Sequence, residues 1–331
     1  MKDGVATGLG GRGLPWKRPG SGTRGRLVDY AFMAVFVLLV VIAAVSSDFF
    51  FSQTNLTNIA RQMVTNGLIS LGMLVVILTG GIDLSVGAVV ALAGIMASGV
   101  QADLPLGLAV VVALAVGSTA GAVNGFLVAR FSLAPFIVTL ATLSAFRGLV
   151  FVYSDTPITP ADPSSRSLLG GGFIGPVPVP VVFMVVCYVL VWLFVGRTTP
   201  GRAIVAIGGN AEAVRLAGVP VRRHVVLAYV LSGFLSALAG ILLVSRLGIA
   251  QPNVGVGYEL DAIAACVIGG AILGGGGGSV IGTLGGVLTL GLIDNLLNLF
   301  NVQSYYQQIL KGAIIVVAVL ARRITKADGL A

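Results

Sequence analysis

Long apolar runs alternate with short polar connections over most of the 331-residue chain. Ten runs are long enough to cross a bilayer as a helix, which takes about 20 residues. Because unpaired backbone groups are not tolerated in lipid, the runs predict helices and not open sheets. The predicted fold class is an all-α polytopic membrane protein with about ten transmembrane helices, at 29–47, 63–79, 84–101, 105–129, 133–154, 177–196, 225–246, 259–274, 279–299 and 304–321.

The positive charges predict how the chain lies in the membrane. With the N-terminus inside, fifteen of the twenty Lys and Arg face the cytoplasm, and cytoplasmic segments carry such an excess. Both termini are therefore predicted to be cytoplasmic. The predicted order is a flexible basic tail over 1–28, a membrane domain over 29–322 with a central loop at 197–224, and a tail over 323–331. The five remaining cations lie in outer connections or the outer halves of spans: Arg61, Arg147, Arg166, Arg246 and Lys311.

Composition supports the membrane assignment. The chain is 56% hydrophobic and only 10% charged, whereas a soluble domain carries about a quarter charged residues. The net charge of +8 does not indicate nucleic acid as a partner, because the cations follow the topology, and lipid is the expected surrounding. Cys187 and Cys266 lie in apolar stretches without paired spacing, so they predict small packing residues and no metal site.

A polar break interrupts the second apolar stretch. Residues 79–87 read "TGGIDLSVG", so Gly80 and Gly81 precede a carboxylate, Asp83, and a hydroxyl, Ser85. Asp or Ser ahead of an apolar helical run is a common N-cap. Ionisable groups at membrane depth also mark solute pathways. Capping and a pathway role are both compatible with this stretch.

A second glycine-rich break lies at 266–286, "CVIGGAILGGGGGSVIGTLGG", and includes Gly269 and Gly270. Short, glycine-interrupted segments in corresponding positions of two halves are typical of a transporter's translocation site. The glycine-broken segments are accordingly expected near 80–87 and 269–282. The run is not a Walker loop, because no Gly-Lys-Ser/Thr follows it. Close helix packing or a bent re-entrant connection is the favoured interpretation.

Few other polar groups fall inside the predicted spans. Asn124, Thr139 and Arg147 are candidates for lining a path. For Asn124 an interhelical hydrogen bond is the favoured alternative, and for Arg147 snorkelling to the interface is at least as well supported. Further candidates of the same kind are Asn66, Thr142, Asp294, Asn295 and Lys311.

The central loop contains a short predicted helix from about Asn210 to Ala217. Asn210 is its predicted N-cap, Glu212 lies in the first turn and favours the helix dipole, and Gly218 ends it. The helix is either an ordinary surface element or a docking element for a cytoplasmic partner.

Four stretches resemble one protein family, the ribose-type monosaccharide ABC importer permeases. They are "GGIDLSVG" at 80–87, "TLATLSAFRG" at 139–148, "GRAIVAIGGNAEAVRLAGV" at 201–219 and "VIGGAILGGGGGSVIGTLGG" at 267–286. The likeness runs from about residue 29 to 322. Ala141, Ala211, Val214 and the run Gly274–Gly278 depart mildly from the family pattern.

The resemblance implies a transport subunit of the bacterial inner membrane and no enzyme. It implies a dimer with a second permease copy or paralogue, cytoplasmic ATPase subunits, and a periplasmic sugar-binding protein. No cofactor would be bound by this chain, since ATP and Mg would sit on the partner ATPase. By the same likeness, 197–224 is the cytoplasmic coupling loop, and its coupling helix includes Gly209, Asn210, Glu212, Ala213 and Gly218.

Two alternatives remain at this point. An ion-coupled secondary transporter would also use broken helices, and permeases of the same architecture carry amino acids or nucleosides. A membrane-bound enzyme would need clustered His, Cys or carboxylates. With one histidine and twelve carboxylate residues, the sequence does not favour an enzyme.

Overall fold

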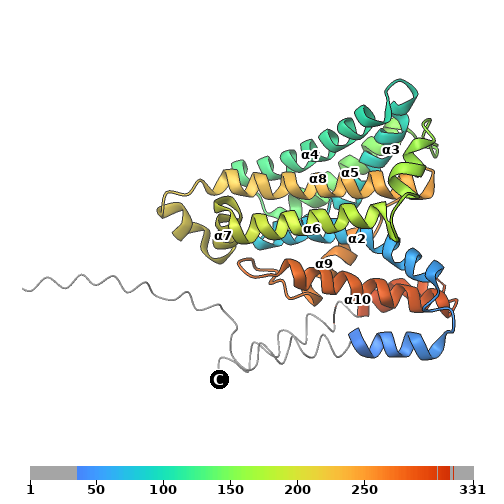
Figure 1. Ribbon diagram of the computed structural model, residues 1–331. Helices are drawn as coiled ribbons and strands as arrows, with labels where there is room; N and C mark the ends of the chain where they lie inside the picture. The colour runs from blue at the N-terminus through green and yellow to red at the C-terminus, as the bar shows by residue number, and fades with distance from the viewer. Residues whose placement is uncertain (1–35, 304, 314–315, 317–331) are drawn as a thin grey trace, which may run out of the picture.

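The computed structural model describes residues 36–303, 305–313 and 316, and it is helical apart from one small hairpin (Figure 1). The predicted tails over 1–28 and 323–331 lie outside the described residues. The hairpin pairs β1 (Phe173–Ile174) with β2 (Val177–Pro178), and an isolated bridge joins Ile158 to Ala250.

Six helices are long and apolar enough to cross a membrane. This confirms an all-α polytopic membrane protein. The six are α2 (Gln53–Leu78), α4 (Leu106–Phe131), α5 (Pro135–Tyr153), α6 (Val179–Arg197), α8 (Val221–Leu247) and α10 (Val280–Leu299).

The other described helices are shorter. An apolar helix covers Phe36–Ser46, and residues 305–313 are also helical. The predicted span 259–274 is wrong in length, because α9 has only 11 residues and measures about 16 Å, roughly half of the hydrocarbon core. The remaining helical elements are α3 (Val86–Gly99), η1 (Val100–Ala102), the π-helical η2 (Ser165–Gly170), α7 (Thr199–Leu216) and α9 (Tyr258–Ile268).

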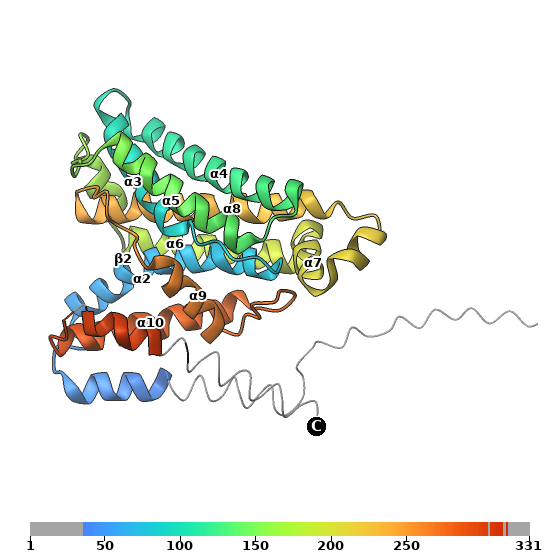
Figure 2. The same ribbon diagram turned by 180° about the vertical axis from the view of Figure 1, so that it is seen from behind.

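Helix α8 runs through the centre of the bundle, with α2, α3 and α4 packed against it (Figures 1 and 2). Small residues permit this contact. Side-chain atoms at Gly117 and Gly121 of α4 would overlap the backbone oxygens of Gly233 and Tyr229 in α8. Glycines spaced four apart let helix backbones approach closely in lipid, where van der Waals packing drives association.

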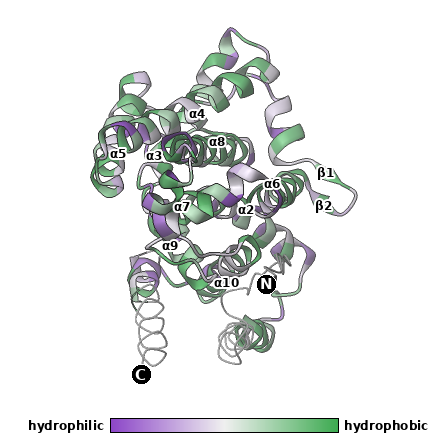
Figure 3. Ribbon diagram, turned by 90° about the vertical axis from the view of Figure 1, so that its left-hand side faces the viewer, coloured by the Kyte–Doolittle hydropathy of each residue, from purple (hydrophilic) through white to green (hydrophobic). Residues whose placement is uncertain are grey.

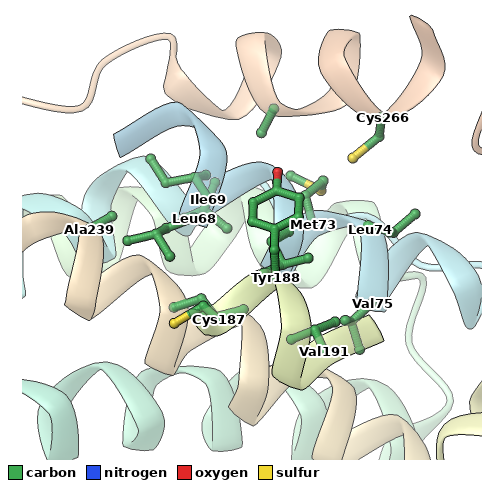
Figure 4. Packing of buried hydrophobic residues seen from close by; sticks show 14 of the residues in the cluster. Leu68, Ile69, Met73, Leu74, Val75, Cys187, Tyr188, Val191, Ala239 and Cys266 are labelled. Atoms are coloured by element: carbon green, nitrogen blue, oxygen red, sulfur yellow. The ribbon is translucent and has the colours of Figure 1, made fainter. Parts of the chain in front are cut away.

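The main apolar core lies between α2, α6, α8 and α9 (Figure 4). Tyr188 of α6 is buried there, and its hydroxyl donates to the Gly67 carbonyl at 3.1 Å, so its one polar atom is satisfied. Cys187 is buried in the same cluster, and the Cys266 thiol lies 3.2 Å from the Ser70 carbonyl oxygen. Both cysteines are free packing residues, as predicted.

Most residues of the bundle helices are hydrophobic (Figure 3). Large side chains such as Phe126, Val152 and Leu190 are exposed on α4, α5 and α6. An apolar exterior is expected of helices that face lipid. The kinked helix α7 lies at one end of the bundle, beyond the end of α2 (Figure 1).

Candidate functional site

The first predicted break exists, because α2 ends at Leu78 and α3 begins at Val86. Asp83 lies inside it and is 1% exposed. Its carboxylate accepts hydrogen bonds from the Ser85 N–H at 3.0 Å, the Ser85 hydroxyl at 2.6 Å and the Ser232 hydroxyl at 2.9 Å. A buried carboxylate needs such partners, since its desolvation is costly. Within this chain, the Asp83 side chain is turned into the protein.

Neighbouring helices complete this network. Asn124 of α4 donates to the Ser85 hydroxyl at 2.8 Å and lies 3.5 Å from the carboxylate. The hydroxyl of Thr139 in α5 donates to the Ile82 carbonyl at 3.1 Å. The favoured prediction for Asn124, an interhelical hydrogen bond, is confirmed. The predicted capping by Ser85 is wrong, because its hydroxyl donates to Asp83 and makes no bond to the first turn of α3.

The two predicted glycine-rich breaks touch each other. The Gly276 N–H donates to the Leu78 carbonyl at 3.1 Å. A Cβ atom on Gly275 would lie 2.8 Å from the Cα atoms of both Gly80 and Gly208. We call Gly80, Gly208, Gly275 and Gly276 the glycine junction, because the ends of the two breaks meet α7 there. Gly80, Gly275 and Gly276 have positive φ angles of 87°, 92° and 72°, which L-residues with side chains rarely adopt.

Two further glycines predicted in the path have packing roles. Gly81 faces Tyr229, whose hydroxyl oxygen would lie 2.6 Å from a Cβ atom at that position. Gly269 ends α9 and faces the Gly282 carbonyl at the start of α10 so closely that no Cβ atom fits. Gly270 follows with a φ of 103° in the turn. Close helix packing, the favoured prediction for the second break, is confirmed.

The order of elements around the first break recurs once more among the described residues. A long helix, an irregular segment and a short helix occur twice. One series is α2, 79–85 and α3, and the other is α8, 248–257 and α9. The second irregular segment lies in the predicted connection between the spans 225–246 and 259–274, but it was not singled out as a break. The two series touch each other near the start of α3 and just before α9, because Gly87 and Gly255 are in backbone contact there.

Arg147 of α5 holds this second segment. Its Nη1 donates to the Pro252 carbonyl at 2.8 Å and the Val254 carbonyl at 2.7 Å. Snorkelling is therefore not its role. Glu259 in the first turn of α9 lies close enough to interact electrostatically with the guanidinium. Arg147 replaces hydrogen bonds that an irregular backbone lacks inside a membrane.

An ion triad joins α9, α10 and the helix at 305–313. The Lys311 ammonium lies 3.0 Å from Asp261 and 3.1 Å from Asp294, and all three side chains are largely buried. Asp294 and Lys311 are therefore paired inside the protein and do not snorkel.

Helix α7 matches the predicted loop helix and extends it toward the N-terminus. Asn210 has non-helical angles, φ −161° and ψ 94°, and divides α7 into two pieces. Its side-chain oxygen accepts the Ala213 N–H at 2.9 Å, so the predicted cap is confirmed. Gly218, with φ 81°, lies just beyond the helix end. Gly209 is exposed at the kink.

The surface of the second piece of α7 is polar and open. Glu212 pairs with Arg215, whose Nε donates to the carboxylate at 2.9 Å. This hydrogen bond holds the pKa of the Glu212 carboxyl below its usual range. Leu216 is 74% exposed beside this pair. An apolar side chain and a charged pair therefore share this open surface.

The described residues contain no group of three or more His, Cys, Asp and Glu that could hold a metal ion. Broken helices inside a polytopic bundle are common in membrane transporters. The chain belongs to the family described as branched-chain amino acid transport system / permease component, which matches residues 55–319. It is a transport component and not an enzyme.

The individual proteins to which the chain is similar are sugar permeases. The chain is 45% identical to the ribose import permease protein RbsC of Haemophilus influenzae over 296 residues, covering 88% of this chain and 91% of that protein. Identity to the RbsC protein of Bacillus subtilis is 46%, with the same coverages. Identity to the L-arabinose transport system permease protein AraH of Escherichia coli is 37%, covering 90% of this chain and 92% of the relative. No solved structure matches the chain significantly.

Proposed function

We propose that this protein is the membrane-spanning permease subunit of an ATP-driven ABC importer that admits a monosaccharide to the bacterial cytoplasm. The observation that carries the proposal is the 43–46% identity to ribose import permeases over about nine tenths of the chain. The family description names branched-chain amino acids. The sugar class is favoured because relatives at 36–37% identity are also sugar permeases, for L-arabinose and D-allose.

The proposed topology has ten crossings with both termini in the cytoplasm. The excess of Lys and Arg on that side supports it. Helices α3 and α9 each complete a crossing together with the irregular segment before them, 79–85 and 248–257. In this arrangement α7 faces the cytoplasm, and the bridge between Ile158 and Ala250 faces the periplasm.

The partners are proposed from the family and from α7. ABC permeases act with an ATPase and a binding protein, and the second piece of α7 offers an exposed, capped helix at the cytoplasmic end. We assign its contact with the ATPase to 210–218. A second permease copy or paralogue would complete the pathway, and ATP with Mg would bind the ATPase and not this chain.

Reconstituted uptake tests the proposal. The permease is placed in proteoliposomes with the ATPase and the binding protein encoded beside it, and uptake of ribose, L-arabinose, D-allose and leucine is measured. ATP-dependent uptake of one of the sugars is expected, with none when either partner is omitted. Uptake by the permease alone under a proton or sodium gradient would instead establish a secondary transporter, and uptake of leucine would establish an amino acid permease.

A further inference from the structure

We propose that Arg61, Arg166 and Arg246, at the outer end of the bundle, form a docking surface for carboxylate side chains of the periplasmic binding protein. We call these three residues the outer arginine cluster. In the sequence they are three of the five cations scattered over the outer side. The inference rests on the proposed function, because it names the surface on which such an importer would receive its binding protein.

The cluster forms where the connection after α5 packs against the end of α8. Gly170 of η2 lies so close to the Ser245 carbonyl oxygen of α8 that no Cβ atom fits there. The neighbouring carbonyl, of Gly171, accepts a hydrogen bond from Nη2 of Arg61 at 3.0 Å. The Arg61 guanidinium also lies 4.7 Å from the centre of the Phe173 ring. Arg61 of α2 is thus fixed against η2 and the hairpin.

The other two arginines surround the same contact. Arg246 is the penultimate residue of α8, and it lies close enough to Arg61 for the two positive charges to repel each other. Arg166 of η2 lies against the turn after α8, because its Nη1 would be 3.4 Å from a Cβ atom added to Gly248. Like charges gathered in this way favour the approach of an anion.

No carboxylate of the described chain neutralises the cluster. The ion pairs among the described residues all lie elsewhere. The other two outer cations have partners, since Lys311 pairs with two aspartates and Arg147 donates to two carbonyls. The Nε atoms of Arg61 and Arg246 are buried without a hydrogen-bond partner, which is costly. Outer segments normally carry few cations, so an acceptor from outside the chain explains the cluster.

A water-soluble protein fits this surface better than lipid does. The cluster is built on η2 and the hairpin, whose loop backbone belongs in water because unpaired backbone groups are not tolerated in lipid. Strand β2 lies near the end of the bundle opposite α7, which is the periplasmic end in the proposed topology (Figure 2). Leu168, Phe173 and Ile174 are large, apolar and exposed beside the arginines. Arginine and aromatic residues are enriched in protein interfaces, and the planar guanidinium matches a carboxylate bidentately.

Binding to the intact permease–ATPase complex tests the proposal. The binding protein, loaded with the sugar that the uptake assay identifies, is titrated onto nanodiscs of phosphatidylcholine, with and without phosphatidylglycerol. Arg166→Glu is expected to weaken its affinity about tenfold at low salt and Arg246→Gln about fivefold, with smaller effects at high salt. Arg130→Gln is the matched control and should not change the affinity. Arg130 also lies beside a phenylalanine ring and is exposed, but at the other end of the bundle, in the last turn of α4.

Uptake and cross-linking separate docking from a structural role. In proteoliposomes, Arg166→Glu should raise the concentration of binding protein that gives half-maximal uptake, with maximal uptake and basal ATP hydrolysis unchanged. Because Cys187 and Cys266 are buried, a benzophenone can be attached selectively to an introduced cysteine. At Leu168→Cys it should cross-link to the binding protein, whereas at Val189→Cys, on the exposed apolar face of α6, it should not.

The opposite results would overturn the inference. Equal affinity of Arg166→Glu and Arg130→Gln would show that the cluster does not receive the binding protein. A lower maximal uptake with an unchanged half-maximal concentration would make the cluster structural. Affinity that requires phosphatidylglycerol, with no cross-link from Leu168→Cys, would assign the cluster to a lipid headgroup. If wild-type uptake is ATP-dependent and binding ignores these charges, only this inference fails; if wild-type uptake is absent, the proposed function fails.

Discussion

Replacement of Gly208 by alanine tests whether the glycine junction connects α7 to the break at 79–85. Gly208 lies in the first piece of α7, against the Leu78 carbonyl and the Gly276 N–H. A methyl group there would come well inside the 3.0 Å that real Cβ atoms keep from other atoms. The neighbouring Gly209 has nothing within 4 Å of the same added atom. The two substitutions are therefore chemically identical and differ only in whether the junction is disturbed.

The magnitude follows from two opposing effects. Alanine favours a helix over glycine by about 1 kcal/mol. Overpacking a close contact costs about 1–3 kcal/mol, and here backbone atoms must move apart because no flexible side chain can yield. The net cost of Gly208→Ala is then about 0–2 kcal/mol, which leaves the fold intact. If α7 and the break act as one unit, a coupling change of 1–2 kcal/mol corresponds to about a 5- to 30-fold loss of transport.

The assay compares the two variants in the reconstituted importer. ATP-dependent sugar uptake and binding-protein-stimulated ATP hydrolysis are measured, together with thermal unfolding of the purified permease. Gly209→Ala is expected to behave like the parent protein. Gly208→Ala is expected to retain ATPase binding and a thermal midpoint within a few degrees, with uptake reduced at least fivefold. Equal uptake by the two variants would refute the reasoning, because the junction would then transmit nothing.

Substitutions at four further positions test the remaining elements. Asp83→Leu leaves three buried donors without an acceptor, at about 1–3 kcal/mol each. The midpoint of thermal unfolding in detergent should therefore fall by ten degrees or more, and by less for Asp83→Asn. A parental midpoint for Asp83→Leu would contradict this network. Arg147→Met should reduce uptake while leaving membrane insertion normal, and unchanged uptake would show that the carbonyls of 248–257 need no donor. Gly218→Val should weaken ATPase co-purification more than Gly218→Asn, because asparagine tolerates the φ of 81° better. If the two variants recover the same amount of ATPase, this helix end has no role in the contact. Glu212→Lys should also abolish transport and reduce ATPase co-purification without preventing membrane insertion. Normal uptake by this variant would contradict the assignment of the ATPase contact to 210–218.

The sequence alone predicted the elements whose signals are local. Apolar runs place the long helices, and the Asn210 cap and the Gly218 stop follow from neighbouring residues. Asp83 has one local partner, Ser85, but its second partner, Ser232, lies 149 positions further along the chain. The segment 248–257 was predicted only as a connection between two spans. Arg147 and Gly87 contact it from other helices, and hydropathy does not register such contacts.

The two irregular segments differ in how their polar atoms are satisfied, and this difference assigns them different tasks. In 79–85, Asp83 accepts hydrogen bonds from Ser85 of the same segment and from Ser232 of α8, and Asn124 adds a further bond through Ser85. Both oxygens of the Asp83 carboxylate already have partners within the chain. In 248–257, Arg147 donates to the carbonyls of Pro252 and Val254, while the side chains of Gln251 and Asn253 are exposed. Movement of α7 would reach the first segment through the contact of Gly208 with the Leu78 carbonyl, and the second segment through the contact of Gly87 with Gly255. The first segment therefore fits a fixed link held by a buried carboxylate, whereas the second is held to α5 through one arginine.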